Sequence, residues 1–258
     1  MNEKHLPISI LDTFAPQDEA LLDRLLAEEI AKNRAKIVVL DDDPTGVQTV
    51  HDISVYTDGS LQSIRAGFAE TNKVFYILTN SRGMTPEQTT VLHKAIGQNI
   101  ARVGRETGIP YLIMSSSDST MRGHYPLAPQ LLREAMEADG FSIDGEILSP
   151  FFKEGGRYTI GNVHYVKQNG ELVPAAETEF AKDKTFGYCH SSIPEDIEEK
   201  TKGSYKAADV TGIALEDLRS LQFDKVTEQL LSVKDFGKIV VNAIDYRDVK
   251  VFAICIYR

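Results

Sequence analysis

The chain has 258 residues, 42% of them hydrophobic and 26% charged, which is enough to bury a substantial core in one large or two small domains. A formal net charge of -10 argues against a nucleic-acid partner or an anionic membrane surface, but leaves room for a local basic pocket that binds an anionic metabolite. Only Cys189 and Cys255 occur, too few for a disulfide framework, and we find neither an export signal nor a membrane-spanning apolar run, so we expect a cytoplasmic protein.

Predicted helices and strands alternate along the chain. Residues 16–33 place leucines and an isoleucine at helical spacing behind early acids, which predicts an amphipathic leading helix within residues 1–34. Residues 85–108 form a second helix-length segment. Short β-branched or aromatic runs predict strands at residues 36–40, 53–57, 73–78, 111–114, 146–148 and 238–243. Together they indicate an α/β fold with a mostly parallel, Rossmann-like sheet flanked by helices.

The middle of the chain departs from this alternation. Residues around 150–190 contain glycine pairs and an Asn-Gly dipeptide flanked by alternating residues. Asn-Gly between alternating residues is a signal for a tight β-hairpin turn. We therefore expect a hairpin-containing excursion in this region.

Polar side chains directly follow three of the predicted strands. Asp41, Asp42 and Asp43 follow one strand, residues 79–82 (TNSR) follow another, and residues 115–124 (SSSDSTMRGH) follow a third. Parallel α/β sheets bind ligands at the carboxyl ends of their strands, so we expect these segments to line one site. Adjacent carboxylates repel one another and resist dehydration unless a cation, a donor or a proton compensates them, which indicates that a polar ligand binds there.

Each cluster also has a plain structural explanation. Strand-end solvation and helix capping account for single acids and serines, a surface turn accounts for residues 153–157, and a satisfied core histidine accounts for His164. Three adjacent aspartates followed by Pro-Thr-Gly exceed what capping requires. Asp118, Arg122 and His124 together can pair a charge with donors that hold an oxyanion, which favours a functional interpretation.

One enzyme class fits the first cluster alone. An apolar strand followed by Asp41, Asp43 and Thr45 resembles the first motif of haloacid dehalogenase-type phosphatases, in which the first Asp is the nucleophile and the second an acid/base, with magnesium. Only Lys182 and Lys184 are candidates for the basic third motif of that class. This alternative would make Asp41 essential.

A second interpretation explains more of the chain. The segments DDDPTG, TNSRG, DSTMRGH, SPFFKEGGRYTIGNVHYV and TEFAKD occur in an order that resembles the amino-terminal, substrate-binding domain of the four-carbon acid sugar kinase family, over roughly residues 35–258. Several ordered motifs are more specific than one aspartate motif. The resemblance implies the acceptor-binding half of an ATP-dependent kinase that phosphorylates a hydroxyl group of a short, four-carbon type sugar acid. A catalytically silent binding module that keeps the fold is a further alternative.

The resemblance also assigns roles to residues. It implies that Asp42 or Asp43 is the catalytic group that orients the acceptor hydroxyl and accepts its proton. A sugar acid needs an arginine fork for its carboxylate and aspartate acceptors for its hydroxyl groups. The substrate-binding residues implied by the resemblance are Thr45, Gly46, Ser81, Arg82, Asp118, Ser119, Arg122, Arg157 and His164, and the residue types of the third cluster add His124. No residue is assigned as a metal ligand.

Three positions depart from the family pattern. Asn80 stands where Asp is common, Ser116 stands where Lys is frequent, and His124 rather than Asn follows the Arg-Gly pair. These departures predict an acceptor preference different from that of the tetronate kinases.

The resemblance extends to domain organisation and partners. It implies ATP and Mg²⁺ as cofactors, bound mainly by a second, carboxyl-terminal nucleotide domain, and the sequence contains no GxxxxGK[ST] loop. We therefore expect a leading helix in residues 1–34, a sugar-acid-binding domain in residues 35–258, and little ATP turnover by this chain alone. The expected partner is a small sugar acid, and a homodimer is compatible with the sequence.

Overall fold

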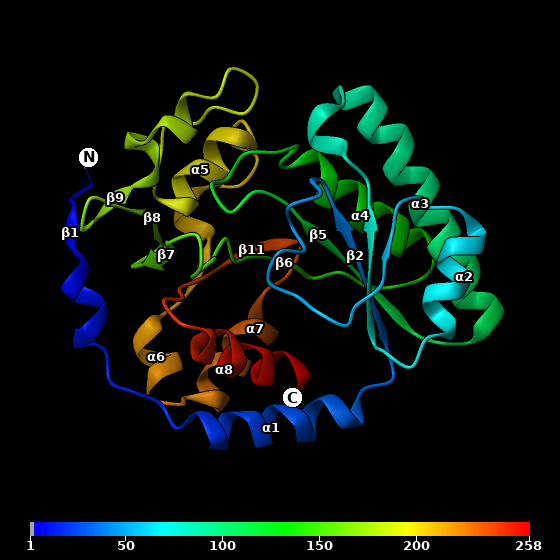
Figure 1. The fold of residues 1–258 in the computed structure, drawn as a ribbon, viewed down its shortest axis with the longest axis horizontal. Helices are drawn as coiled ribbons and strands as arrows, with labels where there is room; N and C mark the ends of the chain where they lie inside the picture. Colours follow the sequence, from blue (N-terminus) through cyan, green and yellow to red (C-terminus); the bar gives the residue numbers. More distant parts are fainter. Residues whose placement is uncertain (1–2) are drawn as a thin grey trace. The chain divides into compact units, whose positions relative to one another are not determined.

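The computed structural model describes residues 3–258, and its fold is drawn in Figure 1. The chain divides into two compact units. The continuous unit is Arg34–Ile143, and the split unit joins the residues up to Asn33 to Asp144–Arg258. The continuous unit has one sheet and one core, and the split unit has two sheets and two hydrophobic clusters.

A four-stranded parallel sheet forms the centre of the continuous unit. Its strands lie in the order β3 (Val55–Tyr56), β4 (Val74–Leu78), β2 (Lys36–Asp41) and β5 (Tyr111–Ser116). Asp41 at the end of β2 is in register with Leu78 on β4 and with Ser116 on β5. Because these strands are parallel, their carboxyl ends lie together at one edge of the sheet.

Helices pack against this sheet because their apolar stripes meet the apolar strand face. The helices are α2 (Leu61–Ala69), α3 (Pro86–Thr107) and α4 (Leu127–Ala138), and a short 3₁₀ turn, η2 (Ser81–Gly83), follows β4. Helix α3 begins with a capping box between Thr85 and Gln88 and ends at Gly108, whose φ of 65° suits glycine. The core between them is built from Val38, Leu40, Ile64, Phe68, Phe75, Ile77, Ile96, Ile100, Ile113 and Leu132.

The two faces of β5 differ in burial. Tyr111 and Ile113 are buried in the core, whereas Leu112 and Met114 are 42% and 47% exposed. Side chains alternate between the faces of a strand, so Ser116 belongs to the face of Leu112 and Met114. Asp41, the register partner of Ser116, therefore lies on the face opposite the helix-covered core.

The split unit contains two small sheets. One is parallel, in the order β10 (Thr211–Ile213), β11 (Gly237–Val241) and β6 (Gly145–Leu148). The other is antiparallel, in the order β1 (Leu6–Pro7), β9 (Glu171–Pro174), β8 (Val163–Gln168) and β7 (Arg157–Ile160). The helical segments are η1 (Ile8–Thr13), α1 (Glu19–Lys32), η3 (Ala175–Glu177), η4 (Glu179–Lys182), α5 (Ile193–Lys200), η5 (Ala207–Asp209), α6 (Leu215–Arg219), α7 (Phe223–Ser232) and α8 (Tyr246–Tyr257).

Helix α1, the predicted leading helix, packs along α8 within the split unit (Figure 1). Asp18 caps its first turn by accepting a hydrogen bond from the backbone of Leu21. Leu22 on its apolar stripe is fully buried with Val251 and Ile254 of α8. The first segment of the chain is thus part of the core of this unit.

The structure confirms the predicted fold class, with an antiparallel sheet in addition to the parallel ones. The predicted strands correspond to β2, β4, β5, β6 and β11 to within two residues at each end, while the strand predicted at residues 53–57 shortens to β3. The predicted excursion contains the hairpins β7–β8 and β8–β9, and Asn169 and Gly170 turn the second with φ values of 49° and 83°. Within residues 3–258, no helix has both the length and the apolar character needed to cross a membrane.

Candidate functional site

Three polar loops leave the same edge of the continuous unit's sheet. Thr79 N donates to Asp41 O at 2.8 Å, and Asp42 N donates to Ser116 O at 3.1 Å, so the hydrogen-bond ladder continues one residue beyond β4 and β2. Arg82 N then donates to Asp42 O at 3.2 Å, which holds the second loop against the first. The strand ends therefore bring the three predicted motifs together.

Arg82 binds both predicted catalytic aspartates. Its Nη2 lies 2.6 Å from Asp42 Oδ1, and its Nη1 lies 3.2 Å from Asp43 Oδ2. The side chains are partly buried, with 22% of Arg82, 11% of Asp42 and 27% of Asp43 exposed. Asn80, with a φ of 53°, turns the chain out of β4 and into the η2 segment that carries Arg82. Asparagine tolerates this left-handed conformation better than most residues.

Thr45 and Gly46 shape the first loop. Asp43 Oδ1 accepts hydrogen bonds from Thr45 N at 2.9 Å and from Thr45 Oγ1 at 2.5 Å, and these bonds hold the pKa of Asp43 below its usual range. Gly46 lies directly over Asp41. A Cβ added at Gly46 would be only 2.2 Å from Asp41 Oδ1. Only glycine leaves room for this approach.

The third loop contains a second carboxylate–guanidinium pair. Arg122 Nε donates to Asp118 Oδ2 at 2.6 Å, and Thr120 Oγ1 also donates to Asp118. Burial raises the pKa of Asp118, but the bonds from Arg122 and Thr120 outweigh it and leave that pKa lowered. Ser119, next in the chain, is half-buried in this loop.

Ser117 joins the third loop to the first. Its Oγ lies 2.6 Å from Asp42 Oδ2 and 3.1 Å from Arg122 O. Ser117 is a residue that sequence reasoning did not single out, since in the run Ser115-Ser116-Ser117 no pattern distinguishes one hydroxyl from the next. The register of β5 decides which serine faces Asp42.

His124 joins the third loop to the second. Its Nε2 lies 3.0 Å from both Ser81 O and Met84 O, and a nitrogen between two carbonyl oxygens must carry the hydrogen. Ser81 is 1% exposed, and its Oγ lies 3.0 Å from Thr79 Oγ1. In this arrangement Ser81 and His124 hold the loops in place.

Arg157 and His164 belong to the split unit. Arg157 lies with its guanidinium carbon 5.2 Å from the centre of the Phe180 ring, and its Nη1 donates to Gly155 O. His164 is fully buried on β8, with Nδ1 3.1 Å from Thr159 Oγ1. The structure thus brings together the predicted residues of the first three motifs, and the roles assigned to Arg157 and His164 stay predictions.

Asp41 differs from its two neighbours. It is 1% exposed, and its Oδ2 has no hydrogen-bond partner among residues 3–258. Burial raises its pKa to about 6, the charge of Asp42 acts in the same direction, and a hydrogen bond from Ser116 opposes them. A phosphatase nucleophile has to meet its substrate, whereas Asp41 lies beneath Gly46, so this geometry speaks against the phosphatase alternative.

The sequence matches the family model described as a sugar-binding N-terminal domain over residues 37–258. The chain belongs to this family. The match confirms the resemblance to the amino-terminal, substrate-binding domain of four-carbon acid sugar kinases. No curated protein matches the sequence.

Two solved structures share the fold of this sugar-binding domain. A Haemophilus influenzae protein of the DUF1537 family has 13% identity and a TM-score of 0.57, over 85% of this chain and 55% of that one. A DUF1537 protein from Bordetella bronchiseptica, a domain-swapped dimer with bound citrate, has 19% identity and a TM-score of 0.58, over 87% of this chain and 57% of that one. The sugar-binding domain therefore spans a little over half the length of both.

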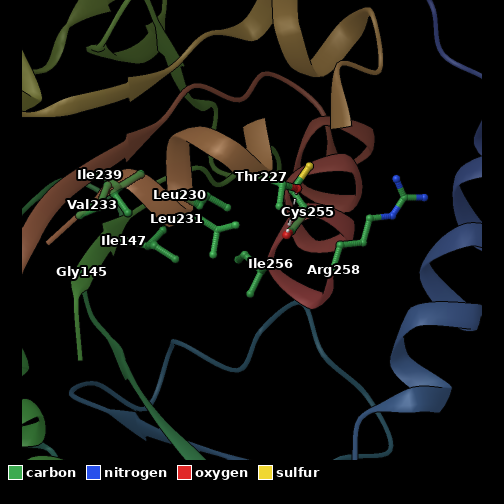
Figure 2. Close-up of a pocket in the computed structure, with 10 residues that line it drawn as sticks. All are labelled: Gly145, Ile147, Thr227, Leu230, Leu231, Val233, Ile239, Cys255, Ile256 and Arg258. Atoms are coloured by element: carbon green, nitrogen blue, oxygen red, sulfur yellow. Dashed lines mark hydrogen bonds between the residues drawn. The ribbon is translucent and has the colours of Figure 1, made fainter. Parts of the chain in front are cut away.

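A separate pocket of about 230 Å³ in the split unit is lined mainly by apolar side chains (Figure 2). Residues of β6, α7 and α8 line it, among them Ile147, Leu231 and Ile256. The Arg258 side chain extends away from these residues, and its Nε lies 3.5 Å from Glu29 Oε1 on α1. Sugars bind through converging polar groups, so the loops of the continuous unit are the better candidate site.

Proposed function

We propose that this sugar-binding domain is the acceptor-binding half of an ATP-dependent kinase that phosphorylates a hydroxyl group of a short, four-carbon type sugar acid. The proposal is carried by one observation, the convergence of Arg82, Asp42, Asp43, Asp118 and Arg122 on loops at a single sheet edge. Guanidinium groups suit the carboxylate of a sugar acid, and carboxylates suit its hydroxyl groups. The family match supports the sugar class of the ligand.

Asp43 is better placed than Asp42 to meet a ligand. Its side chain is 27% exposed, against 11% for Asp42, whose Oδ2 is already bound to Ser117. A carboxylate oxygen accepts more than one hydrogen bond, so Asp43 can bind a hydroxyl group and keep Thr45. In the proposed reaction Asp43 orients the acceptor hydroxyl and accepts its proton.

The guanidinium groups of Arg82 and Arg122 bind the carboxylate of the sugar acid in the proposed complex. Arg82 and Arg122 each bind a carboxylate of the protein, and guanidinium groups with several N–H donors also suit the carboxylate of a ligand. The Bordetella relative binds citrate, a hydroxy acid, which supports the same class of ligand for this domain.

ATP would supply the transferred phosphoryl group, with Mg²⁺ on its phosphate oxygens. The described residues contain no group of three or more His, Cys, Asp or Glu side chains arranged to hold a metal ion, and Asp42 and Asp43 are paired with Arg82. We therefore assign no step of the proposed reaction to a metal ion or to ATP bound by this chain. We propose that the nucleotide site lies mainly on a further domain.

Ligand binding is the direct test. Threonate, erythronate and their oxo forms would be screened by thermal shift, and the hits measured by calorimetry. We expect one of them to stabilise the domain, with binding lost in Arg122→Ala and kept in the control Arg65→Ala, whose side chain pairs with Glu106 outside the site. No response to any sugar acid would leave a silent module as the correct interpretation.

Catalysis requires a separate assay. We expect little phosphorylation of the bound sugar acid by this chain with ATP and Mg²⁺. Transfer at ordinary enzyme rates by the chain alone would contradict the half-kinase proposal. A homodimer is a further proposal, supported only by the domain-swapped Bordetella relative, and light scattering of the chain in solution would test it.

A further inference from the structure

Asp41 is a buried carboxyl group that the proposed reaction does not use. It is 1% exposed, lies under the backbone of Gly46, and has no ion pair among residues 3–258. Its Oδ2 has no hydrogen-bond partner in the described part of the chain. Burying an ionised carboxylate with one oxygen unpaired is costly, so burial shifts the equilibrium of this group towards its protonated form.

Within residues 3–258, the groups that face Asp41 include no cation. Asp42 and Asp43 approach it from the first loop, the hydroxyl group of Ser116 approaches from β5, and Tyr76 approaches from β4. Ser116 and the backbone N–H of Asp43 donate hydrogen bonds, which offset part of the cost of ionisation. Burial and the two neighbouring carboxylates still raise the pKa of Asp41 to about 6.

The site as a whole has an excess of negative charge. Asp41, Asp42, Asp43 and Asp118 carry four carboxyl groups, and Arg82 and Arg122 carry two guanidinium groups, so full ionisation leaves a net charge of about -2 at neutral pH. An arriving sugar-acid anion adds to this excess. Asp43 and Asp118 have lowered pKa values and stay ionised, and Asp42 is held in an ion pair with Arg82. Asp41, buried and with a raised pKa, is therefore the carboxyl group of this site best placed to take up a proton near neutral pH.

We propose that Asp41 couples ligand binding to proton uptake, so that the domain binds the carboxylate form of its sugar acid together with one proton, which resides on Asp41. The inference rests on the proposed sugar-acid function and adds a residue that does not touch the ligand. Asp41 acts as a positioning residue beneath Gly46, and the proton comes from solvent.

The coupling has a defined sign. Below about pH 6 Asp41 is already protonated in the free chain, so affinity should change little with pH. Above that pH the free chain must first take up a proton, and affinity should fall by up to about tenfold per pH unit. Neutralising Asp41 should remove this dependence.

Calorimetry with threonate or erythronate at pH 7, in Hepes and in Tris, counts the protons because the two buffers differ in protonation enthalpy. We expect the wild-type chain to take up close to one proton and Asp41→Asn to take up none, with an affinity that stays level between pH 6 and pH 8. Asp58→Asn is the control, since Asp58 is exposed and caps the turn before α2. It should behave as the wild type.

The outcomes separate the two proposals. If no sugar acid binds at any pH, the proposed function is overturned and the coupling with it. If a sugar acid binds and Asp41→Asn takes up as many protons as the wild type, the coupling alone is overturned. Should Asp41→Asn fail to fold, infrared difference spectra of the wild-type chain decide: ligand addition at pH 7 must produce the band of a protonated carboxyl group, and its absence overturns the coupling.

Discussion

Ser117 Oγ donates a 2.6 Å hydrogen bond to Asp42 Oδ2, which fastens the loop after β5 to the loop after β2. Arg82, on the loop after β4, binds the same carboxylate, with its Nη2 2.6 Å from Asp42 Oδ1. Asp42 is therefore the point at which three loops meet. Its orientation depends on partners that lie 40 and 75 residues away in the sequence.

Ser117→Ala tests this junction. The variant leaves one oxygen of a mostly buried carboxylate without its donor, and we expect a loss of about 1.5–3 kcal/mol in the free energy of unfolding. The affinity for the sugar acid should fall as well, because the variant also removes the hydrogen bond from Ser117 Oγ to Arg122 O and so loosens the third loop. Urea unfolding measures the first effect and calorimetry the second. Ser115→Ala, at an exposed neighbouring position, is the matched control.

Gly46→Ala tests the close approach of the first loop to Asp41. The new methyl group would be 2.2 Å from Asp41 Oδ1, so the loop must move, and we expect a cost of about 1–3 kcal/mol. Gly83→Ala serves as control because a Cβ there meets no atom within 4 Å. Adding Asp41→Ala to Gly46→Ala should recover part of the lost stability. A double variant no more stable than Gly46→Ala would show that the strain has another source.

The pH dependence of stability tests the state of Asp41 without any ligand. Its pKa is about 6 in the folded chain, above the 3.8 that is usual for an aspartate, so its contribution to stability is fully present below about pH 4 and is lost as pH rises through 6. Asp41→Asn should therefore gain stability relative to the wild type between pH 4 and 6, and keep a constant gain of at most about 3 kcal/mol above that. Denaturant unfolding from pH 4.5 to 8 measures the difference. An equal gain at all pH values would show that Asp41 does not titrate in this range.

Lys238 allows a test within the split unit. Its side chain is 1% exposed, and its Nζ lies 2.5 Å from Glu146 Oε2. The same Nζ lies 3.7 Å from the centre of the Phe236 ring and 3.9 Å from the centre of the Tyr205 ring. Lys238→Ala leaves Glu146 buried and unpaired, so we expect a loss of about 3–5 kcal/mol. Lys234→Ala, which removes an exposed pair with Asp144, should change stability by less than about 1 kcal/mol. Comparable losses in the two variants would contradict a buried, structural role for Lys238.

Much of the fold was predictable because its signals are local. Apolar runs of four to six residues separated by amphipathic segments identified β2, β4, β5, β6 and β11, and Asn169-Gly170 identified a hairpin turn. The two-residue strand β1 was not predicted, and β3 is shorter than predicted, since the extent of both depends on pairing with β9 and β4 rather than on their own pattern. The division into two units was not predicted, because contacts between distant segments, such as α1 with α8, define it.

By itself the sequence determined which residue types follow the strands, and therefore that Asp41, Asp42, Asp43, Arg82, Asp118 and Arg122 are candidates for one site. The periodicity of side chains along a strand and the rule that parallel strands end at one edge were sufficient for that step. Tertiary structure alone decided how the candidates divide: Arg82 pairs with Asp42 and Asp43, Arg122 pairs with Asp118, and Asp41 is left beneath Gly46 without a cation. The three aspartates are adjacent in sequence and chemically identical, and only burial and the positions of distant donors make them different.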